Sequence, residues 1–356
     1  MEKINKIKMG RNQYILYKSC NGKYDAGNKF SDDVIEICKR QDIQPIVYGQ
    51  KNSGGLAHRI IFFMKYIFDL LKIKKFSVIY ILYPTMPKYF KYLCYVKRIR
   101  KCKLVGIIMD LPFLCRKVSV STNDIGELLQ MDAIILQNNK QKLLLENIGI
   151  VGKSIEEIGI LDFLGNPNIN SPDSRSYGGR KTILCYGGTL AYDSAGFLYK
   201  WAHSSYINKI KVNVYGRCLE KKLENPHFEY KGVFPPEEIV DNLEGDFGLV
   251  WSGSEIDYCG GMKGSYYDYA SPHKLSMYLM AGMPVIIPKS SALADIVVSK
   301  NIGITVTSLD EIEDKLNRIS LKEYAAMVNA VNKEAKKISL GTNLERCIKE
   351  VRKAFI

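Results

Sequence analysis

The stretch SPHKLSMYLMAGMPVIIP, from Ser271 to Pro288, decides how the second half of the chain folds. Apolar residues such as Leu275 and Tyr278 recur at helical spacing, and Gly282 is expected to end this helix. The run Val285–Ile287 then predicts a short buried strand. A helix, a tight turn and a buried strand in this order are typical of an α/β fold.

The start of the same helix is a candidate anion site. Ser271 and Pro272 end an irregular segment, so the helix is expected to begin near His273 and Lys274. Its free backbone N–H groups and the positive end of its dipole favour an anion, and Lys274 adds a mobile point charge. A phosphate would therefore fit there. An ordinary helix start with a solvated lysine explains the same residues without a ligand.

Length and composition limit what kind of protein this chain can be. At 356 residues the chain exceeds what one hydrophobic core usually serves, so two domains are expected. Its hydrophobic fraction of 46% is that of a soluble globular protein, and no apolar run is long enough to span a bilayer. The start MEKINKIKMGRN lacks the apolar region of a signal peptide, which predicts a cytoplasmic location. Nine Cys residues without CxxC or Cys/His metal spacing predict reduced thiols and no structural metal.

The net charge of +14 makes the surface attractive to an anion. A nucleotide sugar, a nucleic acid and a membrane surface compete for this role, and much of the excess lies in segments such as Lys72–Lys75 and Lys97–Lys103. No signature of a nucleic-acid-binding module accompanies them, so we expect no nucleic-acid partner. A solvated basic face is the simplest alternative.

Two helical segments of the first half leave a further contact open. The segment 58–72, HRIIFFMKYIFDLLK, is apolar around most of its circumference, and the segment 86–102 interleaves aromatic residues with Lys and Arg. Helices packed into the core explain both segments. The alternative is that they rest on a membrane or on a partner subunit, so peripheral membrane contact and a homo-oligomer both stay open.

The first half alternates predicted strands and helices, as in a parallel sheet. Ligands of such sheets gather beyond the carboxyl ends of the strands, so the loop 19–29 would lie on the ligand side. Gly22 and Gly27 allow close approach of the backbone to a ligand, although a plain surface loop is equally consistent. No GxGxxG motif is present here, which removes the best support for a dinucleotide cofactor.

Asp110 is the candidate general base. It follows the predicted strand 104–109, so its carboxylate is expected at the ligand side of the sheet. General-base activation of a hydroxyl group requires a carboxylate or a His that stays ionised within hydrogen-bond reach. A helix N-cap or a salt bridge to Arg116 is the alternative role for Asp110.

The second half supplies further candidate contacts to a phosphate group, each at a predicted strand end. Gly187, Gly188 and Thr189 follow a strand directly, the geometry in which backbone N–H groups can hold a phosphate. Three more residues stand in equivalent positions: Gly216, Arg217 and Ser252. The glycine-containing stretch 253–270 precedes the Lys274 helix and is either a mobile lid or an irregular loop.

The predicted organisation is therefore α/β, with two Rossmann-like doubly wound domains. Residues 1–165 form the first domain and residues 166–180, rich in Gly, Pro, Ser and Asn, form a linker. Residues 181–338 form the second domain, and 339–356 include an amphipathic helix that crosses back onto the first.

The order of these motifs carries a family resemblance. The GGT loop, the VYG stretch before Arg217, the strand end WSGSEID and SPHKLSMYLMAGMPVI follow one another as in bacterial glycosyltransferases of the GT-B fold. The chain is most similar to the family of Gtf3-type glucosyltransferases of serine-rich adhesin glycosylation and β-1,6-galactofuranosyltransferases. YDAGNKFSDDV resembles its acceptor-side signature, which adds Ala26 and Lys29 to Gly27. The family usually has Asn at position 271 and often has His where Met109 precedes Asp110.

The resemblance implies two domains that face a cleft, with a UDP-sugar held by the second and an acceptor sugar by the first. By position, Gly188 and Thr189 would approach the diphosphate, Gly216 and Arg217 would border the nucleotide, and Lys274 would neutralise the departing phosphates.

Helix dipole and Lys can do this without metal, so no cofactor is expected. The paired glutamates E-x7-E of many retaining GT-B enzymes are missing, with Met277 where the second would fall, which favours inversion. The predicted function is transfer of glucose or galactofuranose to a saccharide acceptor on a glycoprotein or a lipid-linked glycan. The alternative is a non-catalytic GT-B-like subunit that binds a partner transferase or a membrane.

Overall fold

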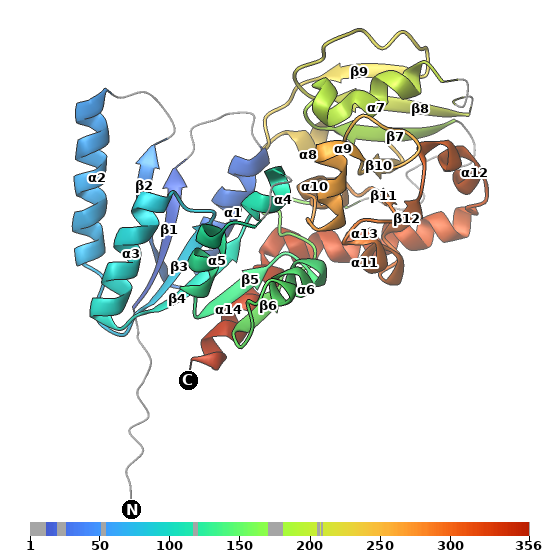
Figure 1. The fold of residues 1–356 in the computed structure, drawn as a ribbon. Coiled ribbons are helices and arrows are strands. Elements are labelled where there is room, and N and C mark those ends of the chain that lie inside the picture. The colour runs from blue at the N-terminus through green and yellow to red at the C-terminus, as the bar shows by residue number, and fades with distance from the viewer. Residues whose placement is uncertain are drawn as a thin grey trace, which may run out of the picture. The chain divides into compact units, whose positions relative to one another are not determined.

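The computed structural model describes residues 12–19, 26–50, 55–116, 120–169, 181–204, 207 and 209–355. The chain divides into two compact units, one of residues 1–158 with 343–356 and one of residues 159–342 (Figure 1). The first unit thus ends before position 165 and includes the last residues of the chain. Of the predicted linker, residues 166–169 are irregular and 170–180 lie outside the described part.

The first unit contains a six-stranded parallel sheet in the order β2-β1-β3-β4-β5-β6. Its strands are β1 (Gln13–Ser19), β2 (Ile43–Gln50), β3 (Val78–Tyr83), β4 (Lys103–Ile108), β5 (Ala133–Leu136) and β6 (Ser154–Glu157). Its helices are α1 (Ala26–Arg40), α2 (Leu56–Leu71), α3 (Pro87–Arg100), α4 (Pro112–Arg116), α5 (Thr122–Leu129), α6 (Asn139–Asn147) and α14 (Thr342–Ala354).

Helices cover both faces of this sheet, because successive side chains of a strand point to opposite faces. Ile79 and Ile81 of β3 join a buried cluster with residues of α2, α3, α5 and α6. Tyr80 between them faces Arg352 of α14, whose guanidinium also donates to the Gln41 carbonyl at the end of α1 (2.7 Å). The first unit is therefore doubly wound.

The second unit repeats this plan with a parallel sheet in the order β12-β11-β10-β7-β8-β9. Its strands are β7 (Thr182–Gly187), β8 (Ile210–Tyr215), β9 (Phe228–Gly232), β10 (Phe247–Leu249), β11 (Val285–Pro288) and β12 (Gly303–Val306). Its α-helices are α7 (Tyr192–Ala202), α8 (Ile239–Asn242), α9 (Gly261–Gly264), α10 (His273–Met280), α11 (Ala294–Ser299), α12 (Ile312–Asn317) and α13 (Leu321–Leu340).

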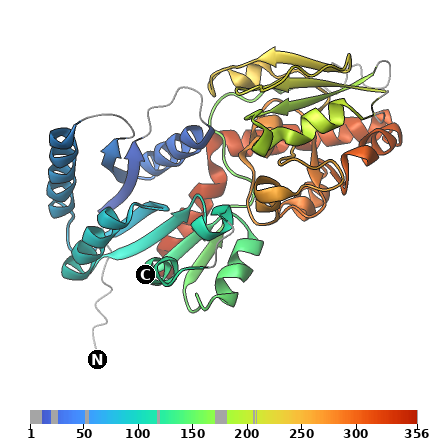
Figure 2. The same ribbon diagram turned by 45° about the horizontal axis from the view of Figure 1, so that its top comes forward.

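Two buried clusters sandwich the second sheet. Ile286 of β11 packs with α7 and α12 on one face, whereas Val285 and Ile287 pack with α10 and α11 on the other. The long α13 contributes to both clusters and runs along the unit in orange-red (Figure 2). The predicted α/β class with two doubly wound parallel sheets is confirmed.

Two elements of the fold are only weakly marked in the sequence. The helix α8 is a single turn within the segment EEIVDNLE. The sixth strand of the first sheet, β6, was not predicted, because its sequence SIEE is polar and its residues are only half-buried at the sheet edge. Among the described helices, none is long and apolar enough to cross a membrane.

Candidate functional site

The helix α10 begins where the sequence predicts. Pro272 is its N-cap residue and His273 its first residue. At the other end, Gly282 adopts a left-handed φ of 71° and closes the helix, as its missing side chain allows. The strand β11 follows after a tight turn. Local sequence therefore fixes where the backbone presents Lys274.

The Lys274 side chain is held in place rather than mobile and solvated, which corrects the expectation. Its Nζ donates to the hydroxyl of Tyr186 (2.8 Å) and lies 3.4 Å from the Trp251 carbonyl oxygen. It also lies 4.0 Å from the centroid of the Tyr186 ring. Burial lowers the pKa of Lys274 to about 7. Within the described chain no carboxylate forms an ion pair with this ammonium, so an incoming anion would be its first opposite charge.

Two of the predicted glycines lie directly against Lys274 and against each other. A Cβ on Gly188 would lie 2.8 Å from Lys274 Nζ, and a Cβ on Gly216 would lie 1.7 Å from the Gly188 carbonyl oxygen. Their φ angles of +155° and +143° also favour glycine. Both glycines are therefore required for close approach. Thr189 and Arg217, the residues that follow them, are exposed.

The backbone amides of this loop act differently from the prediction. The Gly187 N–H donates to the Tyr278 hydroxyl (2.8 Å), and the Gly188 N–H donates to the Tyr215 carbonyl (3.0 Å). These two amides are used within the protein and do not point to a phosphate. The Thr189 N–H, unlike those of Gly187 and Gly188, donates to no protein acceptor within the described chain. Gly188 leaves space beside Lys274, and the Thr189 N–H is the hydrogen-bond donor that faces no protein acceptor among the described residues.

The other predicted donor-side residues surround the start of α10. Ser252 is buried and donates to the Ser194 carbonyl (3.0 Å), and Ser271 is buried beside Pro272. The His273 ring stacks on Phe163, with centroids 5.0 Å apart and an interplanar angle of 23°. These contacts hold the residues at the start of α10 in place and add no second positive charge there.

The glycine-containing stretch 253–270 is more ordered than its composition suggests. It contains α9 and the 3-10 turn Ser265–Asp268, and the Gly253 N–H donates to the Ser194 carbonyl (2.9 Å). The indole N–H of Trp251 donates to the Glu255 carbonyl (2.9 Å). A lid function for this stretch stays a prediction.

Met277 occupies the place where the second glutamate of E-x7-E would fall. Its Cε lies 2.9 Å from the position of a Cβ on Gly187, so it packs against the end of β7. An apolar side chain therefore fills this position.

In the first unit, Asp110 follows the carboxyl end of β4 and is half-buried. Its N–H lies 3.4 Å from the Tyr83 carbonyl at the end of β3. The side chain of Arg116, its alternative salt-bridge partner, lies outside the described residues. The role of Asp110 as a general base stays a prediction.

The acceptor-side candidates lie mainly on α1. Ala26 and Gly27 are its first two residues, and Gly22 lies outside the described part of the chain. Lys29 forms an ion pair with Asp33 one turn further on (2.5 Å), with both side chains largely buried. Met109 Sδ lies 3.7 Å from the hydroxyl of Ser31 on the same helix, which brings α1 to the residue before Asp110.

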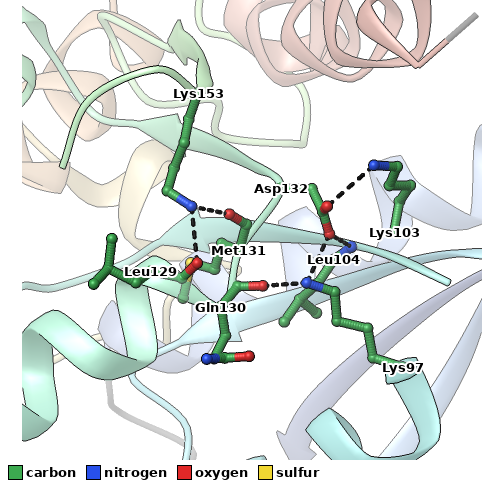
Figure 3. A network of polar contacts seen from close by, with 8 residues as sticks. All are labelled: Lys97, Lys103, Leu104, Leu129, Gln130, Met131, Asp132 and Lys153. Atoms are coloured by element: carbon green, nitrogen blue, oxygen red, sulfur yellow. Dashed lines mark hydrogen bonds and ion pairs between the residues drawn. The ribbon is translucent and has the colours of Figure 1, made fainter. Parts of the chain in front are cut away.

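A second cluster of charges lies at the opposite edge of the first sheet, where β4 and β5 begin (Figure 3). Asp132 lies 2.9 Å from Lys97 Nζ and 3.2 Å from Lys103 Nζ, and it accepts the Leu104 N–H (2.9 Å). Burial raises the pKa of Asp132, but the hydrogen bonds and charge of these lysines lower it below its usual value overall. Part of the basic segment 97–103 therefore has a structural role.

No metal centre is found among the residues that the structure describes, since no group of three or more His, Cys, Asp and Glu could hold an ion.

Comparison with known proteins identifies the family. Residues 13–157 match the family described as "Glucosyltransferase 3-like, N-terminal domain", and residues 184–351 match "Glucosyltransferase 3-like, C-terminal domain". The chain belongs to the glucosyltransferase 3-like family. The resemblance drawn from the motif order is thereby confirmed, and the protein is a glycosyltransferase.

Two relatives of this glucosyltransferase 3-like chain differ in how much they cover. The β-1,6-galactofuranosyltransferase WbbI of Escherichia coli (strain K12) is 27% identical over 331 residues, or 92% of this chain and 94% of WbbI. Glucosyltransferase 3 of Streptococcus gordonii is 32% identical over 101 residues, or 28% of this chain and 29% of that protein.

Solved structures show the fold. HepE of Anabaena, in complex with UDP and glucose, has a TM-score of 0.62 at 12% identity and covers 96% of this chain and 100% of its own. A glycosyltransferase from Rickettsia africae has a TM-score of 0.63 at 12% identity, covering 97% and 99%. The fold of this glucosyltransferase 3-like protein is GT-B, as predicted.

Sequence reasoning missed the tyrosines that organise the donor side of this family member. The Tyr186 hydroxyl accepts a hydrogen bond from the Lys274 ammonium, although the two residues are 88 positions apart. Tyr278 accepts the Gly187 N–H and donates to the Leu249 carbonyl (3.2 Å). Strand alternation in β7 would have placed Tyr186 on the same side as Leu184, but no local signal pairs it with α10.

Proposed function

We propose that this glycosyltransferase transfers a hexose, glucose or galactofuranose, from a UDP-sugar to a saccharide on a glycoprotein or a lipid-linked glycan. The observation that carries the proposal is the Lys274 ammonium, which lies against Gly188 and has no carboxylate partner in the described chain. The names of WbbI and of HepE with UDP and glucose supply the candidate sugars and nucleotide.

In this proposal Lys274 binds the diphosphate of the donor. With a pKa of about 7, the amine is largely unprotonated above neutral pH until an anion arrives. A diphosphate beside it raises that pKa, so the amine takes up a proton as the donor binds. Thr189, with its exposed side chain and unpaired amide, is assigned a second contact to the phosphates.

Departure of UDP is the step that this charge favours. The acceptor oxygen forms a bond to the anomeric carbon while the bond from that carbon to the diphosphate breaks, and UDP leaves with the electron pair. A cation already held at the phosphates stabilises the developing charge without reorganisation. We propose that the transfer needs no metal ion.

We assign the acceptor side to the first unit, with Asp110 as the general base that accepts the hydroxyl proton. Ala26, Gly27 and Lys29 of α1 are assigned to the acceptor sugar. Because Met277 leaves no carboxylate at the position of the second glutamate, we propose direct displacement with inversion. A cytoplasmic location remains a prediction.

The test is release of UDP from a set of UDP-sugars, with and without simple saccharide acceptors. Asp110→Asn should lower the acceptor-dependent rate about 10³-fold, the range of general-base catalysis, and should leave UDP affinity unchanged. The matched control is Asp42→Asn, since Asp42 is exposed and its left-handed φ of 59° suits Asn.

Full activity of Asp110→Asn would refute its role as base. If the wild type releases no UDP from any UDP-sugar, the proposed transfer activity is wrong and the non-catalytic subunit becomes the better hypothesis.

A further inference from the structure

The helix α2 has two apolar sides, and only one of them is covered. Tyr66 and Leu70 are fully buried in the core of the first unit. The opposite side carries five apolar residues that are each more than half exposed, namely Ile60, Ile61, Met64, Phe68 and Leu71. They recur at intervals of three to four residues and so form one stripe. A stripe of this kind on an otherwise folded surface marks an interaction site.

The neighbouring α3 carries exposed apolar residues of its own. The rings of Phe63 on α2 and Tyr92 on α3 lie 5.3 Å apart, and the two helices lie side by side in Figure 1. Tyr92, Tyr95 and Ile99 are exposed at helical spacing along α3, with Ile99 at 72%. We call the five residues of α2 and these three of α3 the apolar face.

The stretch that carries the apolar face is mainly positive in charge. Residues 56–103 contain twelve Lys and Arg and a single acidic residue, Asp69, which gives +11 of the total of +14. Asp69 is itself paired with Lys72 (2.8 Å). Within the described chain, no carboxylate pairs with Lys91, Arg98 or Lys101. Asp132 balances Lys97 and Lys103 at one end of this stretch, and the stretch as a whole keeps a strongly positive charge.

A basic hollow lies beside α3 and shares Tyr95 with the apolar face. It has a volume of about 510 Å³ and is lined on one side by Tyr95 of the apolar face. Its cationic lining comes from Lys91, Lys97, Arg98 and Lys101. Lys97 is engaged with Asp132, so the other three cations are available to an anionic group of headgroup size.

We propose that the apolar face docks on the surface of an anionic phospholipid bilayer. Its side chains would enter the boundary between headgroups and acyl chains, with the surrounding Lys and Arg against lipid phosphates and the hollow holding one headgroup. At 16 residues, α2 lies on the surface rather than across it.

A second copy of the chain fits this face less well. A symmetric dimer through the apolar face would bring together two surfaces rich in Lys and Arg, and like charges across an interface oppose association. Docking on lipid does not depend on the proposed transfer. Docking would also favour a lipid-linked acceptor over a protein-linked one, and this second statement rests on the proposed function.

The experiment is flotation of the full chain with vesicles of phosphatidylcholine alone or mixed with phosphatidylglycerol. The wild type should float with the anionic vesicles, less so at high salt, and not with neutral ones. Met64→Ser combined with Phe68→Ser should lower partitioning at least about tenfold, as should Lys91→Glu combined with Arg98→Glu.

Matched controls lie in the second unit. Leu321→Ser removes an equally exposed apolar side chain, and Lys333→Glu reverses an exposed charge; both should float like the wild type. UDP affinity and thermal unfolding of all variants should stay unchanged, which separates loss of docking from loss of folding or of donor binding.

Equal flotation with neutral and anionic vesicles, or undiminished flotation of both double variants, would overturn the proposal. It would equally fall if light scattering shows a dimer that Met64→Ser with Phe68→Ser dissociates, because a second copy would then cover the face.

Discussion

Lysine side chains lie at the strand ends of both sheets, as a pair in the first unit and singly in the second, and the two sites differ in what balances their charge. Lys97 and Lys103 lie where β4 and β5 begin, and both pair with Asp132. Lys274 lies beyond the carboxyl end of β7 among tyrosine, tryptophan and glycine, with no carboxylate partner in the described chain. A balanced charge stabilises the fold, whereas a buried unbalanced one destabilises it and is kept for a ligand.

Filling the space beside Lys274 should have a larger effect than removing the charge balance of the first unit. Gly188→Ala would place a methyl group 2.8 Å from the ammonium nitrogen. We expect UDP affinity to fall about 10- to 100-fold, because the loss of one hydrogen bond to a charged group changes the binding free energy by that amount. Calorimetry of UDP binding measures this effect.

The matched control for backbone strain is Gly232→Ala. Gly232 also has a left-handed φ, of 97°, but a Cβ there would meet nothing within 4 Å. It should lose some stability and keep its UDP affinity. Equal loss of affinity in both variants would mean that strain, and not the contact with Lys274, is responsible.

Smaller effects of opposite sign are expected for stability. Asp132→Asn should lower the free energy of unfolding by about 1–2 kcal/mol near neutral pH, since it leaves two lysines unbalanced. Lys274→Met should raise it by about 1–3 kcal/mol, because a buried amine that favours neutrality is removed. Urea unfolding measures both.

The pH dependence of these two effects also differs. The folded pKa of Asp132 is lowered, so its stabilisation is present above the unfolded pKa of about 3.9 and is lost as pH falls through the folded value. The folded pKa of Lys274 is about 7, below the unfolded value of about 10.4. Its cost is therefore absent at high pH, grows as pH falls and is complete below neutral pH. A destabilised Lys274→Met, or a stabilised Asp132→Asn, would contradict the comparison.

The sequence predicted those features that local patterns determine. Apolar spacing and Gly282 predicted α10 and β11, and the order of the glycine motifs predicted the family. What it could not predict depends on contacts between distant segments. Tyr186 approaches Lys274 only in the folded unit, and Tyr278 takes the amide of Gly187 that was assigned to phosphate.

The uncovered side of α2 was also undecided from sequence. A helix that is apolar all round is compatible with a buried position, and only the folded unit reveals that Met64 and Phe68 remain exposed.

The most direct test of the central claim is calorimetry of UDP binding at about pH 8 in two buffers of different ionisation enthalpy. Wild type should take up protons on binding, since a diphosphate recharges an amine whose pKa is about 7. Lys274→Met should lose this uptake and most of the affinity, while Lys333→Met, at an exposed site, should match the wild type. Unchanged affinity and proton uptake in Lys274→Met would contradict the role of Lys274 in holding the donor diphosphate.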